Sequence, residues 1–421
     1  MRVRLVAAKR SLGRSVDVAT EAVPVDEQRE QPWFTAGVRG IGGASLLSDL
    51  GHEVPTALLP SLLTSTLHAP AAALGVIEGV ADGLGGLARL GGGALADDPG
   101  RRRSVAVGGY TSVAVLSGLI GAAGAAWQVG LLRAGAWTAR GLRVPARNAM
   151  LADVVPKAAY GRAYGFERAM DNLGAIGGPL LAIALVGLVG IRGAILLSII
   201  PGLLATTAII YAILHTNAPE RRQRQPIRLR VRPLLRGELG RLMLAIGAFA
   251  SGNLAATLMI LRATDVLQPG RTHTSAVQLA LVLYTAYNAA ATLASIPAGR
   301  AGDRIGNIRV LALGAGLFLL AFVGFAATGA SIGLLAGCFI LAGIAIGCAE
   351  TAQSAAVAHL APERLRGSAF GLQAGLQSAG NLAASAIAGG LWTLVSPAAA
   401  FLYAAAWMGI ALTGMLFHGP H

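Results

Sequence analysis

The sequence predicts an all-α membrane protein in which twelve transmembrane helices form two six-helix bundles related by a parallel repeat. Of the 421 residues, 54% are hydrophobic and only 13% are charged, whereas a soluble domain carries about 25% charge. Apolar runs recur along the chain near the length of about 20 residues that a bilayer requires. The motif Gly93-Ala-Leu-Ala-Asp97-Asp98-Pro-Gly100-Arg101 returns as Gly299-Arg-Ala-Gly-Asp303-Arg304-Ile-Gly306, 206 residues later. A repeat at half the chain length indicates two similar halves, which is typical of transporters.

The N-terminal part of the chain predicts a tail followed by the first bundle. Residues 1–39 are polar and contain no apolar core with a cleavage site, so we expect a cytoplasmic tail and no secretory signal. The first bundle is expected over 40–215. Its helices are predicted at 40–67, 72–96, 104–125, 127–152, 162–189 and 192–215.

A basic linker is predicted over 216–240, where seven arginines separate the two bundles. Binding of a partner or of lipid would explain this charge, but a cytoplasmic segment that sets topology explains it more simply. The second bundle is expected over 241–421. Its helices are predicted at 241–267, 274–300, 308–328, 331–355, 366–391 and 396–418.

The positive charge favours a membrane topology over a nucleic-acid partner. The net charge is +14, and 29 of the 34 Lys and Arg residues lie on segments that we predict to be cytoplasmic. This is the positive-inside bias of a multi-pass protein, so we expect both termini in the cytoplasm and a place in the cytoplasmic (inner) membrane. Cys338 and Cys348 lie in or beside apolar runs and are expected to be buried thiols rather than a disulfide.

Intramembrane carboxylates gather in the first half. The repeat pairs Asp49, Glu53, Glu78, Asp82, Glu167 and Asp171 with Ala255, Met259, Tyr284, Asn288, Gln373 and Gln377. A structural requirement would be expected in both halves, so we interpret the acids as an asymmetric site for proton or cation coupling. The alternative is a set of internal ion pairs that fix helix packing. Glu167 lies near the cytoplasmic end and is expected to bind Arg143, Arg147 or Arg162.

Polar residues of the second half predict the neutral wall of a substrate cavity. Gln373, Gln377 and Asn381 follow one another at intervals of four residues and share a helix face. The predicted cavity residues are His52, Asn253, Tyr284, Tyr287, Asn288, Gln373, Gln377 and Asn381. Interhelical hydrogen bonds that hold the bundle together are the alternative. Glu350 and Gln353 are further candidates.

A divalent metal is a second possible cargo. Asp49, His52 and Glu53 on adjacent helical turns offer oxygen and imidazole ligands, although this set contains a single histidine. The sequence contains no Gly-x-x-x-x-Gly-Lys-Ser/Thr loop for ATP, and we expect no cofactor, with a proton gradient as the energy source. No nucleophile, base and orienting group occur at a recognisable spacing, so we expect no enzyme activity.

The repeated motif resembles the loop signature between the second and third helices of the major facilitator superfamily. The resemblance implies that family's fold and a role in stabilising one face of an alternating-access cycle. This role would fall to Gly93, Asp97, Gly100, Arg101, Gly299, Asp303, Arg304 and Gly306. Asp98 stands where most relatives have arginine, which the second copy keeps as Arg304.

Two further features resemble drug-exporting members of this superfamily. Gly174, Gly178 and Pro179 match the Gly-x-x-x-Gly-Pro element of antiporters. Arg133 resembles an arginine implicated in proton coupling, although Trp137 replaces the glycine that follows it in the family. The coupling set is therefore predicted as Asp49, Glu53, Glu78, Asp82, Arg133 and Asp171.

We therefore expect a secondary transporter that works by alternating access and exports a small cationic or neutral, drug-like solute in exchange for protons. The alternatives are a divalent metal exporter and, from another class, a membrane sensor or scaffold without transport. The expected partners are the substrate and the lipid bilayer, with no nucleic acid, and we expect a monomer.

Overall fold

The computed structural model describes residues 32–216, 231–329 and 331–417, and the secondary structure in these ranges is helical throughout. The elements below belong to the compact unit that begins at Trp33. Residues 1–31 of the predicted tail and residues 217–230 of the predicted linker lie outside the described ranges, and α1 begins within the predicted tail, at Ala36.

The first half of the chain folds into an N-terminal bundle. Its helices are α1 (Ala36–Ser61) with a π-helical turn (Leu62–Thr66), α2 (Ala71–Ala96), α3 (Pro99–Leu119), α4 (Ala126–Asp153), α5 (Tyr160–Leu197) and α6 (Ile199–Leu214). Short 3-10 turns at Ile120–Ala122 and Lys157–Ala159 connect α3 to α4 and α4 to α5. Helix α5 kinks at Gly190, whose φ of +71° suits glycine. The kink coincides with the predicted boundary between 162–189 and 192–215.

The second half forms a C-terminal bundle with the same order of crossings. Its helices are α7 (Val231–Leu234), α8 (Gly237–Gly252), α9 (Ala256–Leu267), α10 (His273–Ile305), α11 (Asn307–Ala327), α12 (Ile332–Leu360), α13 (Arg366–Leu394) and α14 (Pro397–Phe417). A 3-10 turn, Glu363–Leu365, precedes α13.

The prediction of one continuous helix over 241–267 is wrong, because the chain leaves the helical path between α8 and α9. Asn253 has extended backbone angles (φ −82°, ψ 94°), and its side-chain amide lies 3.4 Å from Oδ1 of Asn381. The backbone N–H of Ala255 donates to Oγ of Ser385 at 3.2 Å. Side chains of α13 therefore replace part of the hydrogen bonding that a break inside a membrane removes.

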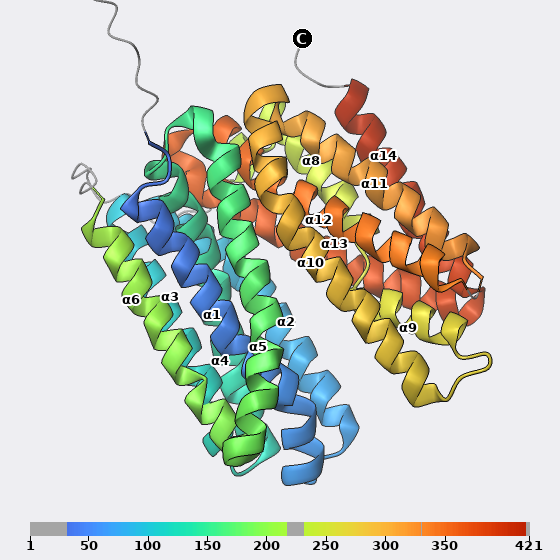
Figure 1. Ribbon diagram of the computed structural model, residues 1–421. Helices are drawn as coiled ribbons and strands as arrows, with labels where there is room; N and C mark the ends of the chain where they lie inside the picture. The colour runs from blue at the N-terminus through green and yellow to red at the C-terminus, as the bar shows by residue number, and fades with distance from the viewer. Residues whose placement is uncertain (1–31, 217–230, 330, 418–421) are drawn as a thin grey trace, which may run out of the picture. The chain divides into compact units, whose positions relative to one another are not determined.

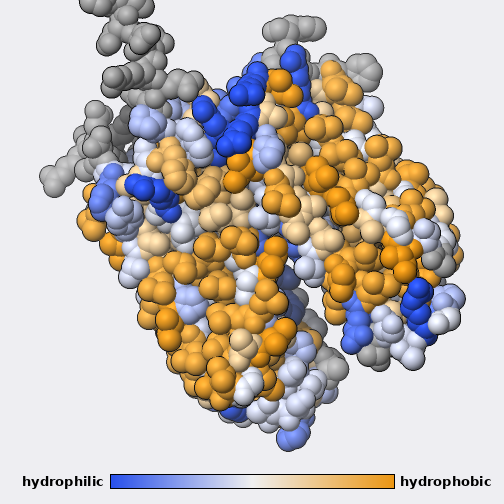
Figure 2. All heavy atoms as spheres, in the orientation of Figure 1, coloured by the Kyte–Doolittle hydropathy of each residue, from blue (hydrophilic) through white to orange (hydrophobic). Residues whose placement is uncertain are grey.

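Seven helical segments among the described residues are long and apolar enough to cross a membrane by length and composition alone. One of them, Lys157–Leu214, contains two of the predicted crossings. The long helices outside this set are α1, α2, α4 and α13, which hold most of the polar residues discussed below. Figure 2 shows apolar side chains over the flanks of both bundles and hydrophilic ones at the end that bears the repeated motif and within the gap between the bundles.

The two bundles touch at the end that bears the repeated motif, here called the motif end, and separate toward the opposite end, the open end (Figure 1). Glycines permit the contact. A Cβ on Gly161 of α5 would collide with the carbonyl oxygen of Gly299 on α10, and a Cβ on Gly93 of α2 would lie 2.8 Å from the carbonyl oxygen of Gly367 on α13. Gly161 and Gly93 are the repeat equivalents of Gly367 and Gly299. The internal repeat thus brings matching residues into matching contacts.

Each motif aspartate binds the start of a helix in the opposite bundle. Asp303 accepts hydrogen bonds from the backbone N–H groups of Gly161 (2.6 Å) and Arg162 (3.0 Å), and from Nε of Arg162 (3.0 Å). Asp97 accepts the backbone N–H of Ser368 at 2.8 Å as well as the Ser368 hydroxyl. A carboxylate at a helix N-terminus satisfies free N–H groups and interacts favourably with the helix dipole.

The remaining motif residues shape the turns themselves. Asp98 caps α3 by accepting the N–H groups of Gly100 (2.9 Å) and Arg101 (3.2 Å), which accounts for an acid at this position. Gly306 ends α10 with a φ of +97°, and Arg304 is exposed. Burial at the motif end raises the pKa of the Asp97 carboxyl above its ordinary value, although the Ser368 donors oppose the shift.

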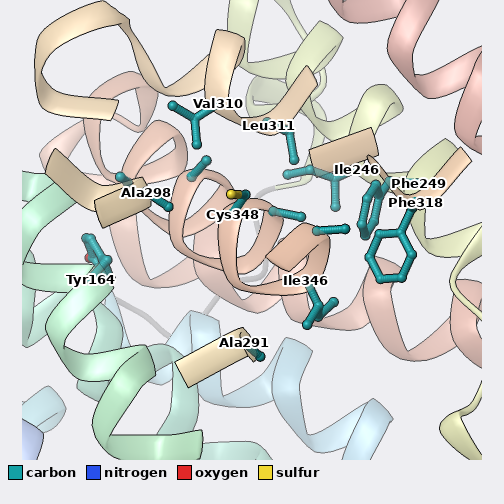
Figure 3. Close-up of a cluster of buried hydrophobic side chains, with 14 of the residues drawn as sticks. Tyr164, Ile246, Phe249, Ala291, Ala298, Val310, Leu311, Phe318, Ile346 and Cys348 are labelled. Atoms are coloured by element: carbon teal, nitrogen blue, oxygen red, sulfur yellow. The ribbon is translucent and has the colours of Figure 1, made fainter. Parts of the chain in front are cut away.

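The C-terminal bundle has an aromatic and aliphatic core that reaches the interface with α5 (Figure 3). Phe249 of α8 meets Phe318 of α11 edge to face, with 5.7 Å between ring centroids. Cys348 and Cys338 are free, buried thiols, as predicted. Tyr164 of α5 is buried beside this core and donates a 2.6 Å hydrogen bond to the carbonyl of Asn148.

Candidate functional site

Helix α4 presents a row of arginines toward α1. Arg133, Arg140 and Arg147 lie seven residues apart and therefore share one helix face. We call these three residues the arginine ladder. Their partners on α1 run in the opposite direction: Arg133 donates to Oγ1 of Thr56 (3.0 Å), and Arg147 donates to Oγ of Ser45 (2.9 Å).

The middle rung of the ladder meets an imidazole between two carboxylates. Nη1 of Arg140 lies 2.6 Å from Nε2 of His52, and its Nη2 lies 3.4 Å from Oδ2 of Asp49. The same Nε2 is 3.3 Å from Oε1 of Glu53. Nδ1 of His52 lies 3.0 Å from the carbonyl oxygen of Ser48, which assigns the hydrogen to Nδ1 and leaves Nε2 as the acceptor for Arg140.

Burial differs sharply within this group. His52 and Asp49 are almost fully buried, at 1% and 3% exposure, whereas the side chain of Glu53 is 26% exposed. Glu53 therefore lies between the buried imidazole and water. The arrangement can pass a proton from solvent to His52 through Glu53.

The rung nearest the open end joins α1, α2 and α4. Nη2 of Arg133 lies 3.0 Å from Oε1 of Glu78, and the Arg133 guanidinium lies over the ring of Trp137, 3.5 Å from its centroid. Nε1 of Trp137 donates to Oδ1 of Asp82 at 2.7 Å. Asp82 is exposed, and its hydrogen-bond partner is a neutral indole, whereas the other predicted carboxylates each lie beside a basic side chain.

The rung nearest the motif end joins α4 to α5. Nη1 of Arg147 lies 2.7 Å from Oε1 of Glu167 and 3.3 Å from Oδ1 of Asp171. Asp171 also binds Nη1 of Arg168 at 3.1 Å, and Nε of Arg168 lies 3.5 Å from Oε2 of Glu350 on α12. This chain of charges crosses from the N-terminal bundle to the C-terminal one. Of the three arginines expected as partners of Glu167, the structure pairs it with Arg147.

The glycines of the antiporter-like motif on α5 set the distance to α1. A Cβ on Gly174 would lie 2.5 Å from the carbonyl oxygen of Leu46 and 2.9 Å from Cβ of Asp49, and one on Gly178 would collide with Cβ of Glu53. Pro179 lies within α5. The motif therefore packs directly behind the two carboxylates on α1, since larger side chains would force the helices apart.

The predicted neutral wall of the second half is partly assembled by hydrogen bonds. Asn253 reaches Asn381 at 3.4 Å, Gln377 donates to Gln353 at 2.7 Å, and the amide of Asn288 donates to its own helix at the carbonyl of Tyr284. The rings of Tyr284 and Tyr287 stack at 5.6 Å. Gln373 is buried, and its Oε1 has no hydrogen-bond partner among the described residues.

The 29 Lys and Arg residues that we predict on cytoplasmic segments include Arg140, Arg143 and Arg147, which the structure places on α4 rather than in the loop that follows it. All three lie inside α4, and Arg143 is 1% exposed with its guanidinium 3.9 Å from the centroid of the Tyr110 ring. The signal that would have revealed the ladder is the seven-residue spacing of arginines within the predicted helix 127–152. The alternative of ion pairs that fix helix packing pairs Glu78 and Asp82 with Arg89, and Glu167 and Asp171 with Arg168. The pair of Arg168 with Asp171 is present at 3.1 Å, whereas Glu78 binds Arg133 and Arg89 donates to Ser378 of α13 at 2.5 Å.

The geometry does not favour the metal alternative. The guanidinium of Arg140 already binds Nε2 of His52 and Oδ2 of Asp49, two of the atoms that a cation would need as ligands. Over the described ranges, no group of three or more His, Cys, Asp or Glu side chains is arranged to hold a metal ion.

Comparisons with known proteins agree with this architecture. The chain is 29% identical to an uncharacterized MFS-type transporter of Methanocaldococcus jannaschii over 371 residues, which cover 86% of this chain and 90% of that protein. It is 27% identical to an uncharacterized protein of Mycobacterium tuberculosis over 397 residues, covering 91% and 92% of the two chains.

Solved structures show the same fold. A bacterial homologue of the iron transporter ferroportin, in an outward-facing state, matches with a TM-score of 0.73 at 15% identity and covers 90% of this chain and 98% of its own. The E. coli fucose:proton symporter matches with a TM-score of 0.72 at 14% identity, covering 93% and 100%. These matches confirm the predicted helical membrane fold of two six-helix bundles. The sequence model of the Major Facilitator Superfamily matches residues 41–270 and again 239–421, so the chain belongs to the Major Facilitator Superfamily.

Proposed function

We propose that this membrane transporter exports a small cationic or neutral solute in exchange for protons. The observation that carries the proposal is the position of Nε2 of His52, which faces a donor, Arg140, at 2.6 Å and an acceptor, Glu53, at 3.3 Å. A ring nitrogen can accept from Arg140 only while it is unprotonated. The two contacts therefore belong to two protonation states.

Protonation of His52 changes the partner of Arg140. A proton enters from water on the partly exposed Glu53 carboxyl and transfers to Nε2 of His52, which leaves the Glu53 carboxylate to accept the new N–H. The imidazolium can no longer accept from Arg140, and the two cations repel each other. Arg140 then retains Asp49 as its partner. Since Arg140 lies on α4 and His52 on α1, proton binding is linked to the packing of these two helices.

The substrate class follows from the charge that remains available. Asp49, Glu78, Glu167 and Asp171 are engaged by arginines, whereas Asp82 is exposed and held by the indole N–H of Trp137. An organic cation would find its counter-charge at Asp82, and the polar residues of the second half would supply neutral hydrogen bonds. This charge balance supports a cationic or neutral solute over an anion.

The orientation that we propose places the motif end in the cytoplasm, since the turns Lys157–Ala159 and Glu363–Leu365 at that end carry Lys157 and Arg364, as the positive-inside rule expects. The structure then corresponds to an outward-open state. Export, rather than uptake, is supported by the packing of the antiporter-like glycines Gly174 and Gly178 behind the carboxylates of α1.

The experiment is proton flux in proteoliposomes that hold the purified protein and an entrapped pH dye. With the interior acidic, addition of tetraphenylphosphonium should release protons from wild-type liposomes. His52→Gln should abolish this release, because an amide does not titrate. The His52→Gln variant should still exchange tetraphenylphosphonium across the membrane when the pH is equal on both sides. His52→Gln liposomes that release protons at the wild-type rate would disprove the coupling role.

Three variants separate proton coupling from substrate binding. Asp82→Asn should weaken tetraphenylphosphonium binding, measured by equilibrium dialysis, while His52→Gln should leave this binding within about twofold of wild type. Glu53→Gln should slow proton release without changing cation binding. Proton release on addition of organic anions, and not of tetraphenylphosphonium, would rule out a cationic substrate. The role of His52 would then be tested by the proton release that those anions cause.

A further inference from the structure

A groove opens on the C-terminal bundle at the motif end, where α14 packs against both α8 and α11 (Figure 1). Its volume is about 380 Å³, at the lower end of the range for small-molecule sites. It is lined by Glu238, Arg241, Leu242 and Ala245 of α8, Ile308 of α11, and Gly414 and Met415 of α14. None of these residues belongs to the candidate functional site described above.

Two side chains of opposite charge line this groove. Glu238 and Arg241 lie three residues apart on α8, so they are neighbours on one side of the helix. Both are exposed, and neither forms an ion pair with another described residue. Glu238 lies in the first turn of α8, where the helix dipole favours a negative charge, but the dipole does not favour the positive charge of Arg241 so near this end. Arg241 is therefore available to an anionic group.

The rest of the groove is apolar and continues into the apolar surface of the bundle. Further from the motif end, α8, α11 and α14 expose Leu244, Leu313 and Ile410. A surface of this kind within the hydrocarbon region suits acyl chains. Gly414 provides room in the groove, since it is exposed and no atom lies within 4 Å of the position that a Cβ would occupy. The groove therefore fits a ligand with a charged head and an apolar tail.

We propose that this groove binds an ethanolamine phospholipid, with its phosphate on Arg241 and its ammonium on Glu238. A guanidinium binds a phosphate through paired N–H donors, and a carboxylate accepts hydrogen bonds from an ammonium. Two carbon atoms separate the ammonium from the phosphate ester oxygen, a spacing that two side chains one helical turn apart can match. The acyl chains lie along the apolar surface that starts at Leu242 and Met415.

The lining of the groove disfavours the other common headgroups. A headgroup that carries only negative charge is attracted by Arg241 but repelled by Glu238. A choline headgroup has no N–H to donate to Glu238, and quaternary ammonium groups are recognised best by aromatic rings. None of the described residues that line the groove is aromatic.

Native mass spectrometry of the purified full-length protein tests this site. The protein is offered equal amounts of phosphatidylethanolamine, its N-methyl and N,N-dimethyl derivatives, phosphatidylcholine and phosphatidylglycerol, all with the same acyl chains. Retention should fall with each added methyl group, because each one replaces an N–H that Glu238 can accept. The ethanolamine lipid should exceed the choline lipid by about threefold, the scale of one exposed ion pair.

Two variants assign the headgroup groups to their partners. Arg241→Gln should lower the retention of all five lipids, since all contain the phosphate. Glu238→Gln should remove the dependence on methylation while phosphate binding persists. Equal retention of the ethanolamine and choline lipids by the wild type would overturn the proposal, as would unchanged retention by Arg241→Gln. Preferential retention of phosphatidylglycerol would overturn it as well, because the groove would then be a site for anionic lipid.

A third variant and a matched control locate the lipid in the groove. Gly414→Leu should fill the groove and lower retention of the ethanolamine lipid. Glu363→Gln with Arg364→Gln should bind as the wild type does, because this exposed acid and base lie at the same end but outside the groove. Equal retention by Gly414→Leu and the control would place the lipid elsewhere and overturn the proposal.

A soluble competitor distinguishes a lipid from a free headgroup. Glycerophosphoethanolamine, which lacks acyl chains, should not displace the bound lipid at equal concentration. Displacement would show that the groove takes a soluble ligand instead. None of these measurements needs substrate or a proton gradient, so failure of the proposed proton coupling leaves the lipid result unchanged.

Discussion

Arg168 of α5 and Glu350 of α12 form an ion pair at 3.5 Å that connects the interiors of the two bundles. Arg168 binds Asp171 at the same time, and Asp171 shares Arg147 with Glu167. Glu350 is therefore a carboxylate of the second half that completes a charge network of the first half. Any change in the contact between bundles must change the partners of Arg168.

We predict that Glu350→Gln favours separation of the motif end. The side chains of Arg168 and Glu350 are 17% and 32% exposed, so the pair is expected to contribute at most about 1 kcal/mol, or roughly a fivefold change in the ratio of the two states. Pulsed electron paramagnetic resonance between spin labels at Lys157→Cys and Glu363→Cys, in a protein whose two cysteines are replaced by Cys338→Ala and Cys348→Ala, measures this ratio. Glu350→Asp should show a smaller change. A longer-distance population that fails to grow would contradict the role of the pair.

Removal of Arg147 alone should destabilise the fold more than removal of Arg147 together with its partner Glu167. Arg147 and Glu167 are nearly fully buried, at 4% and 2% side-chain exposure, so Arg147→Met leaves an uncompensated carboxylate. The expected cost is about 3–5 kcal/mol in the free energy of unfolding. Arg147→Met with Glu167→Gln should recover part of it, and exposed Arg309→Met should be neutral. Thermal unfolding in detergent measures the series, and a double variant that is less stable than Arg147→Met would refute it.

Enlargement of the α5 glycines should disturb the site on α1. Gly178→Val places methyl groups against Cβ of Glu53, and the helices must separate. We expect a loss of about 1–3 kcal/mol in stability and a slower proton release than wild type. Gly187→Val is the matched control on the same helix, because no atom lies within 4 Å of its Cβ position. Equal stability and equal proton release for the two valine variants would show that α1 and α5 tolerate the extra volume.

The fraction of molecules with a closed motif end should rise as the pH falls toward the range in which the Asp97 carboxyl takes up a proton. Burial raises the pKa of this carboxyl, so the closed state binds the proton more tightly than a state in which Asp97 is solvated. The ratio of closed to open should be constant near neutral pH and rise as the pH falls from the raised pKa through the ordinary value of 3.8. The same spin-label distance, measured from pH 7 to pH 4, tests this. Asp97→Asn should remove the dependence, and its persistence in that variant would assign it to another group.

The fold is predictable from the sequence because it depends on the lengths of the apolar runs and on the internal repeat. Composition and the 206-residue offset indicate two matching bundles, and the structure repeats the contact of Gly161 with Gly299 as the contact of Gly367 with Gly93. The break between α8 and α9 was not predictable, because its hydrogen-bond partners, Asn381 and Ser385, come from a helix more than 120 residues away.

The acids of the candidate site follow from the sequence more completely than its bases. Asp49, Glu53 and Glu78 stand out because each interrupts an apolar run, and Arg133 and Arg147 are also expected, the latter as a partner of Glu167. The place of Arg140 between His52 and Asp49 is not expected, because arginine near a helix end usually remains in water. Which acid meets which base depends on how α1, α4 and α5 pack, and one sequence does not contain these distances.

The arginine ladder also has a consequence for biogenesis. An arginine at the centre of a membrane helix costs about 2.5–3.5 kcal/mol on insertion, and α4 contains four arginines. The counter-ions of Arg133, Arg140 and Arg147 come from α1 and α2, which are synthesised earlier, and from α5, which is synthesised later. Helix α4 therefore depends on α1 and α2 to enter the bilayer and on α5 to remain there. Nascent chains that end between α4 and α5 should be the ones that the cell's quality-control proteases degrade most rapidly.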